Sequence, residues 1–478
     1  MTSEMTLKSE LLPHQKEAVN KLKGLKVGAL FMEQGTGKTI TALELARLRY
    51  VAGKIDAVIW LCPCSAKENI KWEILKQCPS ELAKIIIICG IETISSSVRA
   101  NAYLWNYVQQ KRCFLVVDES LLVKNPKAYR TRNITRISEK SVYKLILNGT
   151  PVSRNEADLF AQFYILDWRI LGYQSFWSFA ANHLEYDEHG RVRRALHTDR
   201  LAEKIGPYTY QVLKNDCIQL PKKCYQRECF YMTHEQDVEY DRVAEILLME
   251  VDEYESKTIY RLFSALQAVM SGKKVIFKSK DHFETAEMFD DPMDNPRIQA
   301  LLDTLPKREK AIIFCRYQSE IDQLCSILPG AVRFDGKVKK KDRGKAIEQF
   351  RDKGQYLIAN KNCAGFSLNL QFCRNIIYLS HDWELGKRLQ SEDRIHRYGQ
   401  EKEVVITDIY AKNSLDERIL SCLSRKEGIL GSLQSEIEHS GKNKKQDVLK
   451  KFIYGRRYSK DIFDCPELED DDNAEGLS

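Results

Sequence analysis

The sequence has no apolar run approaching the roughly 20 residues that a membrane-spanning helix needs. Its first residues, Met1 to Lys8, contain no apolar core behind a basic region, so we expect no secretory signal peptide. An excess of charge of one sign is also missing, because 74 Lys plus Arg residues face 67 Asp plus Glu, a net charge of +7. These absences exclude a membrane protein and leave no membrane partner to expect. The small positive charge permits a polyanionic partner without requiring one.

Paired cysteines are missing as well. Fourteen cysteines are scattered through 478 residues, with no C-x-x-C pair and no clustered Cys/His spacing. The nearest two, Cys62 and Cys64, stand at the end of an apolar stretch that predicts a strand. Disulfide frameworks are typical of short secreted chains, so reduced thiols in a cytosolic protein are the favoured interpretation. A structural zinc site is the alternative.

Hydrophobic residues make up 43% and charged residues 29% of the chain, which allows packed cores and excludes wholesale disorder. Short, continuous apolar runs alternate with helical stretches, as in strands buried on both faces of a parallel sheet. The runs lie at 27–32, 57–61, 84–89, 113–117 and 144–147, and again at 311–314, 356–359, 375–379 and 404–407. They flank a middle region that is rich in aromatic and charged residues and has helical periodicity from His234 to Met270. The pattern predicts an α/β protein with two blocks of parallel strands.

A glycine-rich loop directly follows the first predicted strand. Residues 32–39 read Met-Glu-Gln-Gly-Thr-Gly-Lys-Thr and open a helix predicted over 40–50. Glycines allow several N–H groups to face one phosphate group, and the helix N-terminus adds partial positive charge. In such a P-loop Lys38 reaches the β- and γ-phosphate oxygens and the Thr39 hydroxyl suits Mg²⁺. The predicted ATP contacts here are Gly35, Thr36, Gly37, Lys38 and Thr39. A plain strand–helix turn is the alternative.

An acidic pair, Asp118 and Glu119, follows the apolar run at 113–117. Its distance along the chain from Lys38 predicts that this run forms the strand next to the P-loop strand. Carboxylates at the end of a buried strand are costly unless a metal or a water uses them. Asp118 is therefore predicted to hold Mg²⁺, and Glu119 to orient and deprotonate an attacking water. An ordinary acidic turn is the alternative.

Further short segments accompany these two motifs in a fixed order. They are Leu12-Pro-His-Gln15, Leu61-Cys-Pro-Cys-Ser65 with Trp72-Glu73, Lys124-Asn-Pro126, Leu147-Asn-Gly-Thr-Pro151, residues 217–240, Ala311-Ile-Ile-Phe314, Asp335-Gly336, residues 363–370 and Gln390-x-x-Asp-Arg-x-His-Arg-x-Gly-Gln400. Together they resemble the Swi/Snf type of helicase-like ATPase, within helicase superfamily two. The string at 390–400 resembles that family's last motif almost position for position, and the resemblance covers roughly residues 11–435.

This resemblance implies two RecA-like domains that use ATP and Mg²⁺. It implies an adenine contact for Gln15 and coupling roles for Gly149 and Thr150. It implies ATP contacts for Gly365 and Gln390. The chain departs from the family at Met32, Gln34 and Asn148, and at Ser120 and Leu121, where many members have a small residue followed by His.

Two arginines in the last motif suit the chemistry of phosphoryl transfer. The γ-phosphoryl group gathers negative charge as it leaves, and arginines from a second domain can neutralise that charge. Arg394 and Arg397 are three residues apart, which predicts that they share one face of a helix and point into a cleft. Surface ion pairs are the alternative. His396, between them, is predicted to be structural and not a metal ligand.

Four regions follow from the motif order. We predict a RecA-like ATP-binding domain at 1–155, a helical insertion and linker at 156–290, a RecA-like helicase domain with the arginines at 291–435, and a charged tail at 436–478. Blocks of like charge are usually solvated, and a regulatory tail is the alternative.

The sequence indicates the residues that contact nucleic acid less clearly than the residues of the ATP site. Tracking a phosphate backbone needs positive charge and N–H donors but little reading of bases. Trp72 is predicted to lie either near the track or in the core, and the lysines of 337–345 are alternatively a solvated helix start. The predicted DNA contacts are Lys67, Ser95, Lys337 and Asn369.

The sequence thus predicts a monomeric, DNA-stimulated ATPase that moves along double-stranded DNA. We expect it in the cytoplasm of a bacterial or phage-infected cell, or in the nucleus if the source is eukaryotic. One alternative is a helicase that unwinds DNA or RNA. Another is a nucleotide-gated DNA-binding protein without turnover, which the substitution at Leu121 leaves open.

Overall fold

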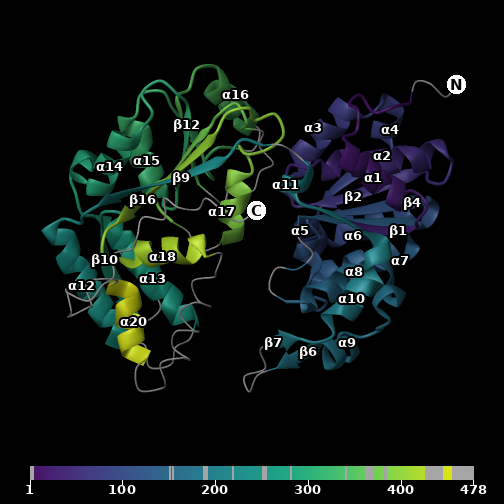
Figure 1. The fold of residues 1–478 in the computed structure, drawn as a ribbon, viewed down its shortest axis with the longest axis horizontal. Coiled ribbons are helices and arrows are strands. Elements are labelled where there is room, and N and C mark those ends of the chain that lie inside the picture. Colours follow the sequence, from purple (N-terminus) through teal and green to yellow (C-terminus); the bar gives the residue numbers. More distant parts are fainter. Residues whose placement is uncertain are drawn as a thin grey trace. The chain divides into compact units, whose positions relative to one another are not determined.

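The computed structural model describes residues 5–149, 152, 155–186, 192–217, 220–249, 256–279, 282–339, 342–360, 370–381, 385–425 and 445–454. These residues form two compact units. The first contains the described residues up to Pro221 together with Leu370, Gln371 and Asp393–Glu401, and the second contains the others. Each unit is a sheet with helices packed on it (Figure 1).

The sheet of the first unit has six parallel strands in the order β3-β2-β4-β5-β1-β8. These strands are β1 (Val27–Met32), β2 (Ala57–Cys62), β3 (Ile86–Gly90), β4 (Cys113–Asp118), β5 (Tyr143–Asn148) and β8 (Thr209–Val212), and a separate antiparallel ribbon pairs β6 (Leu184–Tyr186) with β7 (Val192–Ala195). The helices are α1 (Pro13–Leu22), α2 (Lys38–Val51), α3 (Lys67–Gln77), α4 (Ser80–Lys84), α5 (Ile91–Ser96), α6 (Val98–Gln110), α7 (Tyr129–Lys140), α8 (Ala157–Leu171), α9 (Phe176–His183), α10 (Thr198–Ile205) and α11 (Lys214–Cys217).

Consecutive residues of the central strands enter two different cores. On β2, Ile59 and Leu61 pack in one hydrophobic core, while Val58 and Trp60 pack in another. Because side chains alternate along a strand, this division means that both faces of the sheet are buried. Burial on both faces is the reason that the strands read as continuous apolar runs.

The order of the strands corrects one expectation. The strand that ends in Asp118 was predicted to lie next to the P-loop strand, but β5 lies between β4 and β1 and pairs with both. The number of residues between two strands does not fix which strands are neighbours, so this prediction was wrong. Asp118 nevertheless lies at the same edge as the P-loop, because all the strands run parallel and their carboxyl ends share one edge.

The sheet of the second unit also has six parallel strands, in the order β13-β14-β12-β15-β16-β9. They are β9 (Lys223–Phe230), β12 (Ala311–Cys315), β13 (Ala331–Phe334), β14 (Tyr356–Asn360), β15 (Asn375–Tyr378) and β16 (Val404–Ala411), and β10 (Lys273–Ser279) and β11 (His282–Glu287) form an antiparallel ribbon. The helices are α12 (His234–Met249), α13 (Ser256–Met270), α14 (Pro296–Thr304), α15 (Gln318–Ile327), α16 (Arg343–Asp352), α17 (Leu385–Glu392), α18 (Leu415–Ser424) and α20 (Lys445–Tyr454).

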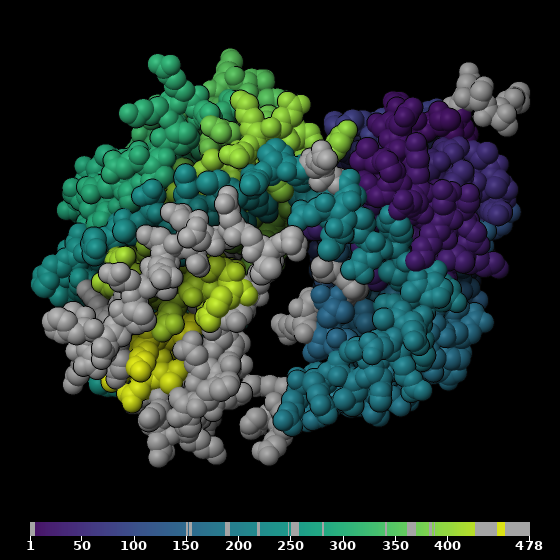
Figure 2. Space-filling model, viewed as in Figure 1, coloured from purple at the N-terminus to yellow at the C-terminus, as the bar shows by residue number. Residues whose placement is uncertain are grey.

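The predicted α/β fold class with two parallel sheets is therefore confirmed. The middle region contributes more than helices, because β8 joins the first sheet and β9 joins the second. In the first unit the purple N-terminal residues and the teal residues near 200 share one surface (Figure 2), since β8 pairs with β1. The bounds of the four predicted regions remain a prediction.

Candidate nucleotide site

The glycine-rich loop leaves β1 and leads straight into α2. Gly35 and Gly37 have φ angles of +85° and +92°, in the left-handed region that favours glycine. Gly37 is the N-cap of α2, no side chain caps the helix, and its first turn has no acidic residue. The amides of this first turn are therefore not used by a side-chain cap, and they carry the positive end of the helix dipole. This is the local geometry that a phosphate group needs.

Two side chains from the first turn of α1 hold this loop. Nε2 of Gln15 donates to the Thr36 carbonyl oxygen at 2.9 Å, and Nε2 of His14 lies 2.8 Å from the same oxygen. Oε1 of Gln15 accepts from the Leu12 N–H at 3.0 Å. Gln15, the predicted adenine contact, thus lies buried against the P-loop, and its contact with adenine remains a prediction. His14 was not predicted as a site residue, and only its place beside Gln15 could have indicated it.

The Lys38 ammonium lies at the end of β1. Its Nζ donates to the Met32 carbonyl oxygen at 2.7 Å and to the Glu33 carbonyl oxygen at 3.4 Å. Burial lowers the pKa of Lys38, while the negative charges of Glu119 and Asp118 act in the opposite direction. The lysine therefore lies within the electric field of the acidic pair, and its contact with the phosphate oxygens remains a prediction.

The acidic pair occupies the end of β4. Asp118 is buried, and its Oδ1 accepts from the Glu119 N–H at 3.0 Å. Glu119 has φ 54° and ψ 54°, a left-handed conformation that is rare for a residue with a side chain and is found mainly at functional sites. Burial raises the pKa of Asp118, the charge of Glu119 raises it further, and Lys38 opposes both.

These residues fit a magnesium ion bound with a nucleotide. The Thr39 hydroxyl and the Asp118 carboxylate are hard oxygen donors of the kind that Mg²⁺ prefers, and a divalent cation would relieve the crowded negative charge at Asp118 and Glu119. In the part of the chain that the structure describes, no group of three or more His, Cys, Asp or Glu side chains could hold a metal ion. Magnesium commonly takes only one or two protein ligands and completes its shell with phosphate and water.

A buried chain of hydrogen bonds extends from the acidic pair. Ser120 donates from Oγ to Oε1 of Gln162 at 2.6 Å, and Gln162 donates from Nε2 to the Asp158 carbonyl oxygen at 2.7 Å. The Asp158 carboxylate pairs with Lys124 at 3.2 Å. The resemblance pointed to Ser120 only as a departure and to Lys124 only as part of a motif. The structure joins them through α8, which no sequence pattern had connected to the acidic pair.

The arginine segment belongs to the first unit, but it is not a helix. Helix α17 ends at Glu392, and Arg394 and Arg397 lie in the turns that follow. The predicted shared helical face is therefore wrong. The physical reason is that the carbonyls of this segment bind partners outside a helix, since Leu370 donates its N–H to the Arg394 carbonyl at 3.2 Å and Lys214 donates to that of His396.

The charges of this segment reach the P-loop residues. Burial, and then the neighbouring charge of Arg397, lowers the pKa of Arg394 to about 10, while Glu119 acts in the opposite direction. Burial also lowers the pKa of Arg397. A Cβ at Gly35 would lie 3.2 Å from Cβ of Arg397. The segment thus lies against the P-loop, with both arginines partly withdrawn from water.

The remaining predicted site residues are distributed over both units, and some of them lie outside the described residues. Gln390 is half-buried on α17, in the second unit. Gly149 follows β5 and donates its N–H to the Asn148 side chain at 2.8 Å. His396 is buried, with Nε2 2.8 Å from the Pro221 carbonyl oxygen, as expected of a structural residue. Three predicted residues, Thr150, Gly365 and Asn369, lie outside the described residues.

The described residues among the predicted DNA contacts belong to both units. Lys67 begins α3, Ser95 is exposed on α5, and Lys337 of the second unit forms an exposed ion pair with Asp322 at 3.0 Å. Trp72 on α3 is 56% exposed, with the Lys76 ammonium 4.9 Å from its ring centre. A core role for Trp72 is therefore wrong, because the ring faces solvent.

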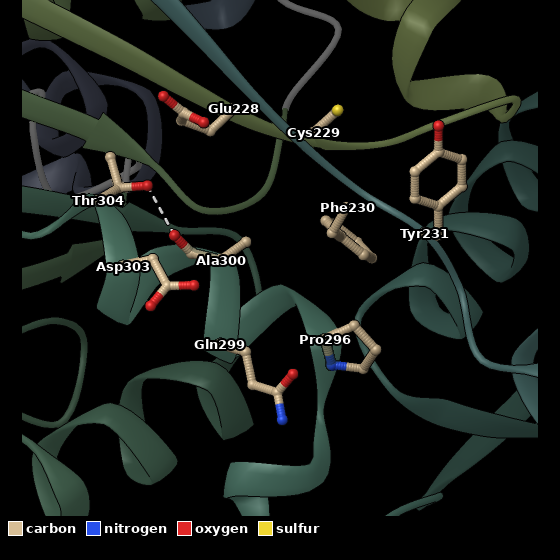
Figure 3. A pocket seen from close by; sticks show the side chains of 9 residues that line it. All are labelled: Glu228, Cys229, Phe230, Tyr231, Pro296, Gln299, Ala300, Asp303 and Thr304. Carbon is tan, nitrogen blue, oxygen red and sulfur yellow. Dashed lines mark hydrogen bonds between the residues drawn. The ribbon is translucent and has the colours of Figure 1, made fainter.

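A surface cavity of about 390 Å³ lies in the second unit, between the end of β9 and α14 (Figure 3). Its lining includes Glu228, Tyr231, Gln299 and Asp303, and it contains none of the predicted site residues. Among the described helices, none combines the length and the apolar character that crossing a bilayer requires.

Comparisons with known proteins agree with the order of the motifs. The SNF2-related domain family matches residues 14–281, and the family of the helicase conserved C-terminal domain matches residues 296–399. An uncharacterized ATP-dependent helicase of Mycoplasma genitalium is 24% identical over an alignment of 450 residues, and the match covers 88% of this chain and 42% of the relative. A Caenorhabditis elegans homolog of SWI/SNF-related matrix-associated actin-dependent regulator of chromatin subfamily A-like protein 1 is 24% identical over 456 residues, covering 90% of this chain and 62% of the relative. The chain thus spans less than two thirds of either relative.

One similar solved structure is the Sulfolobus solfataricus SWI2/SNF2 ATPase core in complex with dsDNA. It is 20% identical in sequence, with a TM-score of 0.41, and the match covers 88% of this chain and 92% of that chain.

Proposed function

The chain belongs to the SNF2-related domain family, and on that premise we propose that it is a DNA-stimulated ATPase that moves along double-stranded DNA. The resemblance to the Swi/Snf type of helicase-like ATPase is confirmed by this family match. Movement along DNA would remodel the DNA or displace proteins bound to it. A monomer, working in a bacterial cytoplasm or a eukaryotic nucleus, is part of the same proposal.

One observation carries the proposal: a P-loop ammonium, an acidic pair and an arginine segment act on one another electrostatically within the first unit. The charges of Glu119, Asp118, Asp393 and Arg394 all act on Lys38. ATP hydrolysis needs these three kinds of group together, namely a cation on the phosphates, a carboxylate that orients water and arginines for the developing charge. A simple strand–helix turn would need none of them.

Each residue then has a distinct task. The amides of the loop and Lys38 bind the phosphate groups, and Thr39 and Asp118 would hold Mg²⁺, which supplies charge neutralisation when it is bound. Glu119 orients a water molecule and accepts its proton. Arg394 and Arg397 stabilise the negative charge that develops in the transition state.

In this proposal, ATP hydrolysis is coupled to movement by the way the chain passes between the two units. Residues 393–401 pack with the first unit, while α17 before them and the described residues from Lys402 onward belong to the second unit. A change at the nucleotide that shifts the arginine segment therefore pulls on the second unit through the chain at both ends. Steps of this kind gate turnover in many enzymes that close around a ligand.

The first test is ATP hydrolysis measured with and without duplex DNA. We expect DNA to raise the rate, and Lys38→Ala to lower it by about 10²- to 10³-fold or more, because a preorganised cation on the phosphates is lost. Lys23→Ala is the matched control, since this lysine is exposed and bonds only locally to Asn20. Equal rates with and without DNA, or turnover that survives in Lys38→Ala, would contradict the proposal.

A second assay separates translocation from unwinding. A motor that tracks intact duplex displaces the third strand of a triplex but leaves a fork of paired strands closed. Opening of the fork would instead favour the alternative, a strand-unwinding helicase of the same superfamily.

A further inference from the structure

A buried lysine joins the arginine segment to the first unit. Lys214, the first residue of α11, is 3% exposed. Its Nζ donates to Oδ1 of Asp393 at 2.7 Å and also to the His396 carbonyl oxygen. Asp393 precedes Arg394, and His396 precedes Arg397, so one ammonium binds the turn on both sides of Arg394.

The backbone of Lys214 is fixed to the strand that carries the P-loop. Its N–H donates to Oε2 of Glu33 at 2.7 Å, and the N–H of Glu33 donates to the Val212 carbonyl oxygen at 3.1 Å. A Cβ at Gly35 would lie 3.6 Å from Cε of Lys214, close to where it would meet Arg397. The side chain and backbone of Lys214 therefore connect the arginine turn to the first residues of the P-loop.

The ion pair with Lys214 also compensates the negative charge of Asp393. The Asp393 side chain is only 13% exposed, and its negative charge acts on Arg394, on Arg397 and on Lys38. A buried carboxylate binds the nearest available cation, because an uncompensated buried charge is costly. Lys214, bound to Oδ1, compensates the charge of Asp393 inside the first unit.

We infer that Lys214 is a positioning residue for ATP hydrolysis, which holds the Asp393–Arg397 turn against the P-loop so that both arginines face the phosphates. The inference rests on the proposed function for its effect on turnover. Its structural part, the attachment of the turn, stands by itself. Lys214 touches neither substrate nor reacting atoms in this scheme and acts through the arginines.

The test compares Lys214→Met with Lys223→Met. Lys223 is the control, because it pairs at 2.9 Å with Glu392, the residue that directly precedes Asp393. When Lys223 is removed, Glu392 still has its ion pair with Arg388. We expect Lys214→Met to lower kcat by about 10²-fold, as a displacement of about 1 Å does, while the affinity for a fluorescent ATP analogue changes less than about threefold. Lys223→Met is expected to leave both within about twofold.

Hydrogen–deuterium exchange supplies a readout that does not depend on turnover. The amides of residues 393–401 are expected to exchange faster in Lys214→Met and at the wild-type rate in Lys223→Met. If the wild-type chain did not hydrolyse ATP, the proposed function would fail while this exchange experiment still tested the attachment. Unchanged exchange in Lys214→Met would overturn the inference.

Two further variants guard against misfolding. Asp393→Asn keeps the shape and an oxygen acceptor for Lys214, so it should fold and lose part of the kcat. Because Asp393→Asn removes the negative charge that Lys214 compensates, Lys214→Met should cost less in the Asp393→Asn background than in the wild type in a double-mutant cycle. Independent effects of the two substitutions, or a loss of kcat matched by an equal loss of ATP affinity, would refute the positioning role.

Discussion

Replacing Gly37 by alanine tests how the P-loop is held. A Cβ at this position would lie 2.2 Å from Nε2 of Gln15, so Gln15 would have to leave its site and give up the hydrogen bonds to Thr36 and Leu12. Two such bonds contribute about 2 kcal/mol together. The φ angle of +92° adds about 1–2 kcal/mol of strain for a residue with a side chain. We expect the free energy of unfolding of the first unit to fall by about 3–4 kcal/mol.

Gly53→Ala is the matched control for Gly37→Ala. Gly53 also has a positive φ, +63°, but a Cβ there would meet nothing within 4 Å, so it should cost only the strain of about 1–2 kcal/mol. Urea unfolding followed by tryptophan fluorescence measures both, because five of the six tryptophans lie in residues 1–221. The affinity for a fluorescent ATP analogue should fall in Gly37→Ala and stay unchanged in Gly53→Ala.

The steric part of this reasoning has its own test. In a Gln15→Ala background the clash is gone, so Gly37→Ala should then cost only about 1–2 kcal/mol, and the double-mutant cycle should show a coupling of about 2 kcal/mol. Equal costs for Gly37→Ala and Gly53→Ala, or strictly additive effects of Gln15→Ala and Gly37→Ala, would refute it.

Two other predictions concern stability and thiol chemistry. Arg297→Met should destabilise the second unit by about 3–5 kcal/mol, as measured by chemical unfolding followed by circular dichroism. The reason is that Arg297 pairs at 2.5 Å with the buried carboxylate of Asp416 on α18, which would lose its compensating charge. Arg112→Ala breaks a solvent-exposed pair and should destabilise the first unit far less; equal costs would show that burial is not the reason. In titration of the native protein with a thiol reagent, the exposed Cys224 and Cys229 should react rapidly. Burial raises the pKa of Cys373 to about 12, so this thiol should react only after unfolding. A rapid phase that is unchanged in the Cys224→Ser/Cys229→Ser variant would contradict this.

The main strands and the P-loop were predictable because their patterns are local. The run at 113–117 is strand β4, and the helix expected at 40–50 is α2, which begins two residues earlier at Lys38. Burial on both faces leaves a continuous apolar run, and a glycine-rich turn between a strand and a helix is written in consecutive residues. Both signals can be read without knowing any long-range contact.

The strands β8 and β9 were missed for the opposite reason. Each lies in the middle region, among aromatic and charged residues, and β9 is exposed over most of its length at the edge of its sheet. An edge strand with exposed faces carries no apolar run to mark it. Trp72 gives the converse case, an aromatic residue at helical spacing whose ring faces solvent.

The sequence by itself determined the two parallel-strand blocks, the P-loop and the acidic pair, because each depends on residues that are close together in the chain. Only the tertiary structure decided that β5 separates β4 from β1, and that Gln15 holds the Thr36 carbonyl. It also decided that the arginine segment is a turn, since the contact that holds it runs from Lys214 to Asp393 across 179 residues. Hydrogen bonds and ion pairs between such distant residues leave no periodic pattern in the sequence, and they form only where the fold brings their partners within reach.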